Sequence, residues 1–290
     1  MAQLKQRRSE NESGNFYVDQ SCIDCDTCRW MAPEVFKRAG EQSAVYHQPS
    51  NETEQLRAMQ ALLSCPTASI GTLEKPKDIK SIHQSFPILI ADNVYHCGYH
   101  SESSFAAASY FIQRQDGNIL IDSPRFAPPL VKRLEELGGI RYLYLTHRDD
   151  VADHQKFRDH FGCDRILHVD DLTAETQSVE IKLSGFEDIQ FAPDILIIPV
   201  PGHSKGHTVL LYNHKFLFTG DHLAWSSQLN QLYAFRRYCW YSWSEQIDSM
   251  KKLVNYAFEW VLPGHGHRHS ADSITMQKQM QECVSWMTQN

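Results

Sequence analysis

The sequence repeatedly places histidine or aspartate directly after a short apolar segment. Four such segments in the C-terminal part of the chain run into turns that carry these residues, at positions 146–150, 201–203, 219–222 and 263–265. A short apolar run bounded by turn residues is typical of a buried strand. Side chains at the ends of strands in an α/β sheet commonly converge on one site. Imidazole and carboxylate groups are ligands for divalent zinc, iron or manganese, so the pattern predicts a metal site at the strand ends.

A helix is expected between two of these strands. Residues 118–122 are mostly apolar, and the next segment repeats apolar residues at helical spacing from about Pro129 until Gly138 and Gly139 end it. Residues 140–145 are again apolar. The alternation of strand, helix and strand favours an α/β architecture.

The strand-end motifs resemble a known superfamily. In chain order, T-H-x-D…D-H, P-G-H-S-x-G-H, T-G-D and P-G-H-G are similar to the metallo-β-lactamase-fold dinuclear metalloenzymes over roughly residues 88–275. The resemblance implies an αββα sandwich with metals at the strand ends. It also implies a ligand set, with one metal held by His147 and His203, a second by Asp153, His154 and His265, and Asp221 as the bridge.

The first motif departs from the pattern of that superfamily. The superfamily has H-x-H-x-D-H, whereas here a carboxylate replaces the second histidine and two additional residues precede Asp153 and His154. We take Asp149 as a ligand, with Asp150 as the competing position. A carboxylate in place of an imidazole makes the site harder, which favours iron or manganese relative to an all-histidine pocket.

A second metal motif lies near the N-terminus. Cys22, Cys25 and Cys28 follow C-x2-C-x2-C spacing, and Cys65 precedes a proline. Three thiolates in one tight loop offer three corners of an iron–sulfur cluster, and Cys65 supplies the fourth. A zinc knuckle or unliganded thiols are the alternatives, but zinc sites favour paired C-x2-C units, and no second pair is present.

These motifs divide the chain into segments. Residues 15–73 resemble a single-cluster [4Fe–4S] ferredoxin and are expected to form a small α+β domain, with residues 1–14 as a disordered tail. Residues 74–87 are charged and unpatterned, which indicates a linker, and residues 88–290 form the metallo-β-lactamase-fold domain.

Composition excludes several classes of protein. No apolar run approaches the roughly 18 residues of a membrane-spanning helix, and the polar N-terminus lacks the apolar core of a signal peptide. We therefore expect a soluble, cytoplasmic protein in a reducing compartment. The chain carries 28 Lys and Arg against 35 Asp and Glu, a net charge of −7, which makes nucleic acid an unlikely partner.

Residues near the motifs suggest supporting roles. Asp122 ends its own strand and is a candidate to orient a metal-bound imidazole, or an exposed turn residue. Residues 232–243 are rich in aromatic side chains and either pack in the core or form a wall of the substrate pocket, where Arg236 or Arg237 would meet an anionic group.

Three hypotheses for the function follow. The first is a metal-dependent hydrolase acting on a small acyl compound such as a thioester or lactone, with Asp153 or Asp221 taking a proton. The second is a di-iron or mono-iron oxidoreductase that receives electrons from the cluster, because flavodiiron proteins resemble this domain and also have a carboxylate at the second position of the first motif. That hypothesis allows for an electron-transfer partner. In the third, the cluster is a structural or regulatory sensor and the altered motif is a decayed site.

Overall fold

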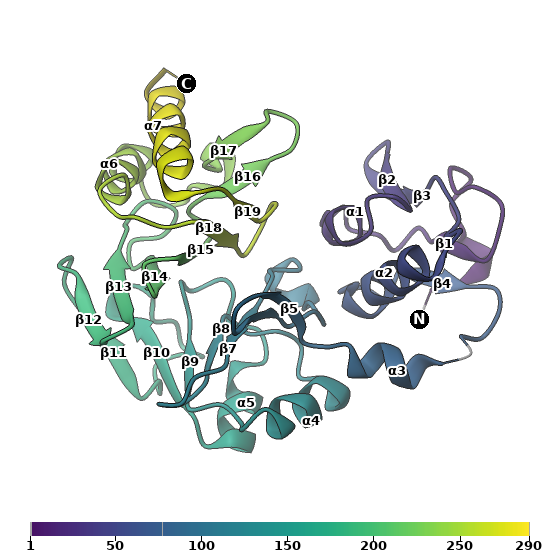
Figure 1. Ribbon diagram of the computed structural model, residues 1–290, viewed down its shortest axis with the longest axis horizontal. Coiled ribbons are helices and arrows are strands. Elements are labelled where there is room, and N and C mark those ends of the chain that lie inside the picture. The colour runs from purple at the N-terminus through teal and green to yellow at the C-terminus, as the bar shows by residue number, and fades with distance from the viewer. Residues whose placement is uncertain (1, 77, 290) are drawn as a thin grey trace. The chain divides into compact units, whose positions relative to one another are not determined.

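The computed structural model describes residues 2–76 and 78–289. The chain divides into two compact units. Unit 1 comprises Met1–Asn118 and Pro124–Ile140, and unit 2 comprises Ile119–Ser123 and Arg141–Asn290. The residues that follow the expected linker at 74–87 belong to unit 1 up to Asn118. Figure 1 labels the helices and strands of both units.

The N-terminal part of unit 1 is a small α+β arrangement. Its elements are η1 (Leu4–Gln6), β1 (Phe16–Val18), α1 (Thr27–Met31), β2 (Phe36–Ala39), β3 (Gln42–Val45), α2 (Glu52–Ser64) and β4 (Ile70–Thr72). Strand β1 pairs antiparallel with β4, and β2 forms a hairpin with β3. Helix α2 begins after Asn51, whose side chain accepts a hydrogen bond from Glu54 N, as expected for a helix cap. Helices and strands enclose a core that includes Phe16, Phe36, Val45 and Met59.

The segments expected to be a tail and a linker carry structure of their own. Arg8 is buried and donates hydrogen bonds to Ser43 O and Ala39 O, which ties the N-terminal segment to the β2–β3 hairpin. Residues 79–84 form helix α3 (Ile79–Gln84), and Phe86 directly after it is fully buried. Arg8 and Phe86 do not belong to a periodic sequence pattern. Composition alone therefore predicted that both segments are irregular.

The rest of unit 1 contains an antiparallel meander and a helix. Strands β5 (Ile88–Ala91), β6 (Val94–His96) and β7 (Tyr110–Ile112) pair in sequence order, with η2 (Glu102–Ser104) before β7. Helix α4 (Pro128–Glu136) has proline in its first turn and buries Leu130, Val131 and Leu134. It begins one residue before the expected start, and Gly138 and Gly139 follow it as predicted.

Unit 2 is a sandwich of two sheets between helices. One sheet contains the parallel strands β8 (Ile119–Ile121), β9 (Tyr142–Tyr144), β10 (Asp164–His168) and β11 (Ile181–Leu183). The other contains β12 (Ile189–Ala192), β13 (Ile195–Pro199), β14 (Thr208–Tyr212), β15 (Phe216–Gly220), β18 (Trp260–Pro263) and β19 (His269–Ser270). Thr208 N donates to Thr146 O at 2.9 Å, which links the two sheets beside the predicted metal site.

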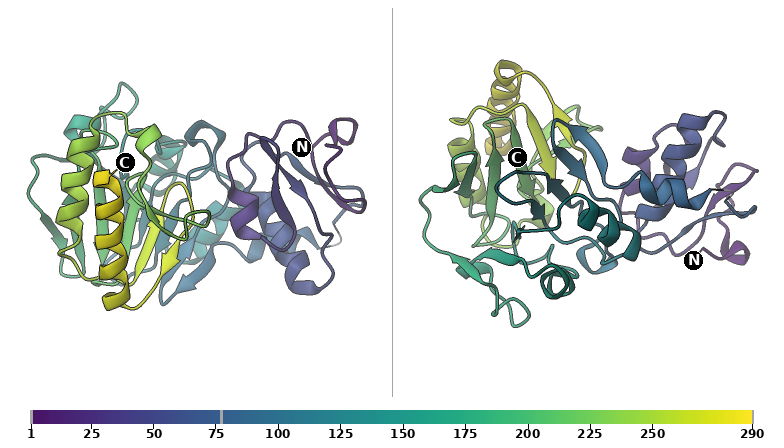
Figure 2. Two further views of the ribbon diagram at one scale, coloured as in Figure 1. Left: turned by 90° about the horizontal axis from the view of Figure 1, so that it is seen from above. Right: turned by 60° about the horizontal axis from the view of Figure 1, so that its bottom comes forward.

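Helices cover the outer faces of this sandwich. Helix α5 (His154–Phe161) lies on the side of the first sheet, and α6 (Trp243–Leu253) and α7 (Ser273–Gln289) lie side by side over the second (Figures 1 and 2). Met250, Met276 and Met280 pack with Leu211 and Val261 in one buried core. A hairpin of β16 (Ala224–Ser226) and β17 (Gln231–Tyr233), η3 (Val169–Asp171) and η4 (Arg236–Tyr238) complete the unit. This layering is the αββα arrangement expected from the motifs.

The strand directions bring the predicted ligands to one edge of each sheet. Strands β8 and β9 are parallel, as are β15 and β18, and β13 runs in the same direction as β15 because β14 lies antiparallel between them. Each of these strands ends just before a residue of the predicted site. Side chains that follow parallel strands therefore meet at the same end of the sandwich.

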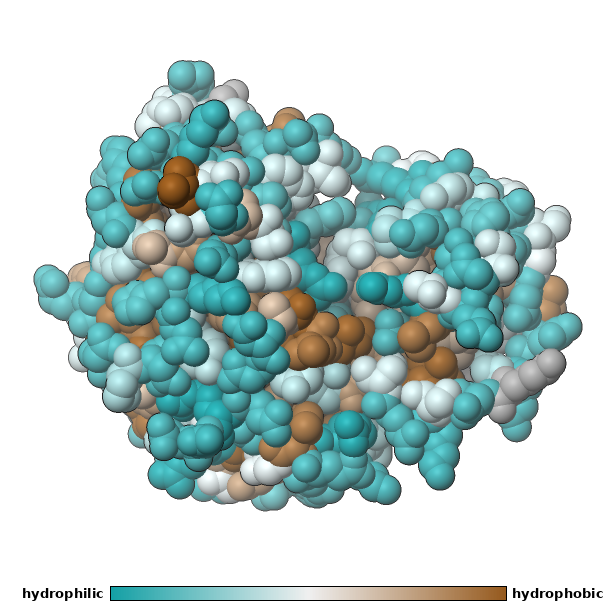
Figure 3. All heavy atoms as spheres, viewed as in Figure 1, coloured by the Kyte–Doolittle hydropathy of each residue, from teal (hydrophilic) through white to brown (hydrophobic). Residues whose placement is uncertain are grey.

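A membrane-spanning helix requires a long, apolar sequence. Among the described residues, no helix is both long and apolar enough to cross a bilayer. On the face drawn in Figure 3, apolar side chains gather in a few groups within a mainly hydrophilic surface.

Candidate metal centres

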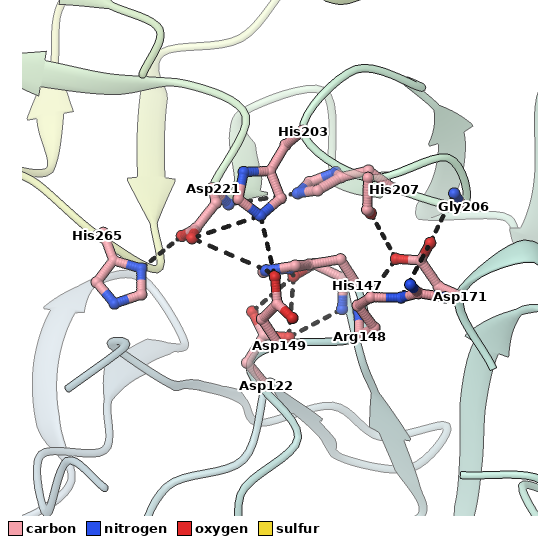
Figure 4. A network of polar contacts seen from close by, with 12 residues as sticks. Asp122, His147, Arg148, Asp149, Asp171, His203, Gly206, His207, Asp221 and His265 are labelled. Carbon is pink, nitrogen blue, oxygen red and sulfur yellow. Dashed lines mark hydrogen bonds and ion pairs between the residues drawn. The ribbon is translucent and has the colours of Figure 1, made fainter. Parts of the chain in front are cut away.

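Four side chains from three strand ends of unit 2 point toward a common point (Figure 4). Asp149 Oδ2 lies 3.3 Å from His203 Nε2 and 3.8 Å from His147 Nε2. Asp221 Oδ2 lies 3.8 Å from each of the same two nitrogens. We call the group formed by His147, Asp149, Asp150, His203, Asp221 and His265 the strand-end centre.

His147 is oriented by hydrogen bonds that begin at Asp122. The buried carboxylate of Asp122 accepts from Thr146 N at 2.8 Å and from Thr146 Oγ1 at 3.0 Å. Thr146 Oγ1 in turn lies 2.9 Å from His147 Nδ1, which leaves Nε2 facing the centre. Of the two roles considered for Asp122, the geometry favours orientation of the imidazole, through the threonine hydroxyl, and Asp122 is buried and not an exposed turn residue. Burial raises the pKa of Asp122 to about 7.

The two carboxylate oxygens of Asp221 lie close to different histidines. While its Oδ2 faces His147 and His203, its Oδ1 lies 2.6 Å from His265 Nδ1. Burial opposes ionisation of Asp221, but the imidazoles of His265, His147 and His203 outweigh that effect and hold its pKa well below the usual range. An ionised carboxylate with its two oxygens on two sides of the centre has the geometry of a bridging ligand.

Asp150 lies deeper in the centre than Asp149. It is fully buried, and neither carboxylate oxygen has a hydrogen-bond partner among the described residues. Gly264 gives it room, because a Cβ on that glycine would lie 2.6 Å from Asp150 Oδ2 and 3.1 Å from Asp221 Oδ1. Burial and the nearby Asp221 raise the pKa of Asp150 well above the usual range. Asp149 and Asp150, which the sequence offered as competitors, both face the centre.

The structure does not bring Asp153 and His154 into this group. Asp153 precedes helix α5 and forms an ion pair with Lys156 Nζ at 2.7 Å. His154 is the first residue of that helix, and its Nδ1 lies 3.2 Å from Arg165 Nη1. The turn at residues 150–153, which includes the two additional residues of the motif, lies between the end of β9 and helix α5. Their roles as ligands, and that of Asp153 in proton transfer, therefore have no support in the geometry.

Asp171 is a residue of the site that the motifs did not reveal. This fully buried aspartate accepts from Arg148 N at 3.0 Å, from Gly206 N at 2.7 Å and from the Ser204 hydroxyl. It joins the loop that carries His147 and Asp149 to the loop that carries His203. Asp171 follows β10, a strand end that carried no recognised motif, so only the fold could identify it.

Two further histidines line the centre without joining it. The ring of His207 stacks on that of His147 with centroids 4.8 Å apart, and its Nε2 accepts a hydrogen bond from Asp221 N. His222 is fully buried, and neither of its nitrogens has a hydrogen-bond partner among the described residues. Burial lowers the pKa of His222 to about 3, so it is neutral at physiological pH.

The donor set fits divalent metal ions. His147 Nε2 is buried and makes no hydrogen bond within the described part of the chain, which is costly unless another group occupies the position. Burial also lowers the pKa of His147 to about 4, so the nitrogen is a neutral donor. Groups of ligand atoms within 4.8 Å of one another are His147, Asp149 and His203, and also His147, Asp150 and Asp221. These positions suit zinc, iron or manganese.

A cavity of about 440 Å³ opens beside the centre. Its lining combines cations, acids and aromatic rings, namely Arg148, Asp149, Asp170, Ser204, Lys205, Trp240 and Tyr241. The aromatic segment 232–243 thus contributes two rings to the pocket wall, while Leu232 and Ala234 pack in the core. Among these lining residues the cations are Arg148 and Lys205, not the expected Arg236 or Arg237.

The second candidate centre lies in unit 1. Cys22, Cys25 and Cys28 lie on the loop that ends in α1, and Cys65 caps the end of α2. Backbone N–H groups of Ser43 and Ser69 donate to Cys22 Sγ and Cys65 Sγ at 3.5 and 3.3 Å. Burial raises the pKa of Cys25 to about 11, so cluster binding must compensate for deprotonation of the thiol. Four thiols, two of which accept from the N–H groups just described, fit an iron–sulfur cluster.

Comparisons with known proteins agree with both parts of this description. Residues 18–72 match the sequence model of a family described as the 4Fe-4S single cluster domain of Ferredoxin I. Among solved structures, VMB-1 is 19% identical with a TM-score of 0.52, covering 69% of this chain and 96% of its own. The DIM-1 metallo-β-lactamase exposed to ceftazidime is 15% identical with a TM-score of 0.54, and the match covers 68% of this chain and 95% of its own.

A metallo-β-lactamase from Pontibacter korlensis is 14% identical with a TM-score of 0.50, covering 70% of this chain and 98% of its own. The chain therefore has the metallo-β-lactamase fold together with a ferredoxin-type module, which confirms the predicted fold. No curated protein matches the sequence.

Proposed function

We propose that this chain is a metal-dependent hydrolase in which water activated at the strand-end centre attacks the acyl carbon of a thioester or lactone. The observation that carries the proposal is the convergence of two imidazole nitrogens and two carboxylates beside a cavity. His147, His203, Asp149 and Asp221 would hold one ion, and Asp150, Asp221 and His265 the second.

The chemistry divides between the metal and the protein. A bound divalent ion supplies a Lewis acid and lowers the pKa of a coordinated water toward about 7. Asp221 would act as a ligand, because its pKa is held well below the usual range, with Oδ1 held by His265 and Oδ2 facing His147. Asp171 keeps the two ligand loops in register during the reaction.

The cavity favours an acyl substrate with an anionic group. Arg148 and Lys205 present cationic side chains on the same wall as Trp240 and Tyr241. Lys205 Nζ forms an ion pair with the half-buried Asp170 at 3.0 Å, so a substrate anion would compete with that carboxylate. A small molecule with an apolar body and a carboxylate or phosphate matches this lining better than a neutral ester.

Reconstitution with single metals tests the proposal. The protein is loaded with zinc, manganese or iron(II) in turn and offered matched anionic and neutral thioesters and lactones. We expect hydrolysis of an anionic acyl substrate, a loss of more than about 100-fold in His203→Ala, and a raised KM in Lys205→Gln. Lys251→Gln, at an exposed surface ion pair, is the matched control. Absence of acyl hydrolysis with every metal would contradict the proposal.

The second candidate function is an oxidoreductase, and two observations favour it. A ferredoxin-type module is fused to the metal site, and three of the six residues of the strand-end centre are aspartates. In this case the centre would hold iron that accepts electrons from the cluster, and a separate protein would supply them. Counting metal and sulfide in anaerobically purified protein, with EPR, separates the candidates. Two zinc ions and no iron beyond the cluster would exclude the oxidoreductase.

A further inference from the structure

A row of polar contacts in unit 1 leads from a cluster cysteine to two buried histidines. Cys25 Sγ lies 3.5 Å from Thr27 Oγ1, and Thr27 Oγ1 lies 3.1 Å from His100 Nδ1. His100 Nε2 lies 2.8 Å from His96 Nε2. Both histidines lie outside residues 18–72, the segment that matches the ferredoxin family. The cluster loop is therefore bonded to a segment beyond the ferredoxin-type module.

The row is enclosed by other side chains. Thr27 is 1% exposed, and His96 and His100 are both fully buried. Trp30 packs against the two imidazole rings, with centroid distances of 5.1 and 5.9 Å. Water cannot easily replace these hydrogen bonds, and a buried polar group without a partner is costly. The contacts therefore have a fixed geometry.

Cluster binding fixes the direction of the hydrogen bonds. In the free thiol the Cys25 S–H can donate to Thr27 Oγ1, but a cluster ligand is a thiolate and has no hydrogen to give. The Thr27 O–H then donates to Cys25 Sγ, which leaves Thr27 Oγ1 as the acceptor and His100 Nδ1–H as its donor. His96 faces the other nitrogen of the His100 ring and holds that ring in place.

Other sulfurs of the cluster site have donors that a substitution at Thr27 or His100 leaves in place. Cys22 and Cys65 accept from the backbone N–H groups of Ser43 and Ser69, and Cys65 Sγ also lies 3.8 Å from Thr67 Oγ1. Cys25 accepts from the Thr27 backbone N–H as well as from the Thr27 hydroxyl, and only this hydroxyl can rotate, in a direction that His100 determines. Hydrogen bonds to cluster sulfurs stabilise the more negative, reduced state and raise the reduction potential.

We propose that His100, braced by His96, is a positioning residue that raises the reduction potential of the cluster by directing the Thr27 hydroxyl onto Cys25. The inference does not depend on the proposed hydrolase activity, because it concerns only the cluster site and its surroundings in unit 1. It also gives the histidines near β6, which the strand-end centre does not use, a defined role.

An EPR-monitored redox titration of the full-length, cluster-loaded protein tests this proposal. We expect Thr27→Val and His100→Leu each to decrease the equilibrium constant for one-electron reduction about tenfold, which is a shift of about 59 mV to lower potential. The double variant should shift no further than Thr27→Val, because both changes remove the same hydrogen bond. Thr27→Ser and His100→Gln keep a donor and should remain close to the wild-type potential.

The controls make the outcome decisive. His47→Leu removes an exposed histidine of the same module and should leave the potential unchanged. Wild-type potentials in both Thr27→Val and His100→Leu, at full cluster content, would overturn the proposal, as would an equal shift in His47→Leu. If His100→Leu does not assemble a cluster, the pair Thr27→Val and Thr27→Ser decides the question, since valine is isosteric with threonine and only serine retains the hydroxyl.

Discussion

The two candidate centres are built in opposite ways. Three of the four cluster cysteines lie within residues 22–28, and their positions depend mainly on one loop and the start of α1. The residues of the strand-end centre are spread from His147 to His265, and the pairing of strands in two sheets brings them together. The first centre is encoded locally, whereas the second exists only when the sandwich has formed.

Because of this difference, the two centres depend on different supporting contacts. The cluster loop would bind its metal with few supports, namely backbone N–H groups and the hydroxyls of Thr27 and Thr67 near the sulfurs. The strand-end centre needs remote supports such as Asp171, which joins two loops, and Gly264, whose missing Cβ leaves room for Asp150. Substitutions far from the ligands in sequence should therefore damage the strand-end centre more than the cluster.

The largest expected effect comes from removing one ligand from each centre. His147→Ala should remove metal from unit 2 and reduce hydrolysis by more than about 100-fold, because His147 belongs to both groups of ligand atoms, while the cluster remains. Cys28→Ser should abolish the [4Fe–4S] EPR signal and leave the metal content of unit 2 unchanged. Metal counting by mass spectrometry and EPR on the same samples measure both.

A control and a contrary result define this test. His160→Ala changes an exposed histidine on α5 and should alter neither metal. If Cys28→Ser also removed the metal of unit 2, the two centres would not be independent, and the contrast between local and assembled sites would fail. If Cys28→Ser kept its metal but lost all activity, the oxidoreductase candidate would gain support.

A smaller effect is expected when only a support of the strand-end centre is changed. Asp171→Asn removes the charge that accepts from Arg148 N, Gly206 N and Ser204, and it brings an amide N–H toward those donors. We expect metal affinity or activity to fall about 10- to 100-fold, with normal cluster content. Asp159→Asn, on the exposed face of α5, is the control. Wild-type metal affinity in Asp171→Asn would show that the two loops hold their positions without it.

The same contrast explains what the sequence could predict. The cysteine spacing predicted the ferredoxin-type module, and the resemblance carried by the strand-end motifs implied the αββα layering; both predictions are confirmed. Asp153 and His154 illustrate the limit, because two additional residues in a turn change their direction without changing any periodic pattern. Asp171 illustrates another, since its neighbours in sequence carry no motif, and its partners lie 23 and 35 positions away.

The burial of a single charged residue could not be predicted from the sequence either. Arg8 lies in a polar segment whose composition predicted a disordered tail, yet its guanidinium is held by two backbone carbonyls. A lone charged residue is usually exposed, so burial of this kind follows from tertiary contacts alone. The contribution of a buried cation to stability can be measured where it lies in a strand that leads to a candidate site.

Arg165 in β10 provides the last test, through its partner Glu180. Arg165 is 1% exposed, and its Nε and Nη2 lie 3.0 Å from the two carboxylate oxygens of Glu180. Burial opposes ionisation of Glu180, but the hydrogen bonds from Arg165 outweigh it and lower the pKa of Glu180 to about 2. Glu180→Gln removes the charge partner of Arg165, which keeps its hydrogen bonds to Gln155 and Ser178. Because Glu180 is exposed and solvent screens the pair, we expect unit 2 to lose only about 1 kcal/mol of stability at neutral pH.

The pH dependence gives this prediction its sign. Because folding lowers the pKa of Glu180, its stabilising contribution is complete above about pH 4.5 and is lost as the pH falls toward 2. The difference between wild type and Glu180→Gln should therefore be largest above pH 5 and shrink on acidification, with Glu187→Gln at an exposed position as the control. Hydrogen–deuterium exchange of peptides from β10 and β11 measures it locally. Equal protection of these peptides in both proteins at pH 7 would mean that the ion pair does not support the strands beneath the strand-end centre. Faster exchange of the β10 and β11 peptides in Glu180→Gln, with unchanged exchange around Cys22–Cys28, would show that only the strand-end centre depends on this ion pair.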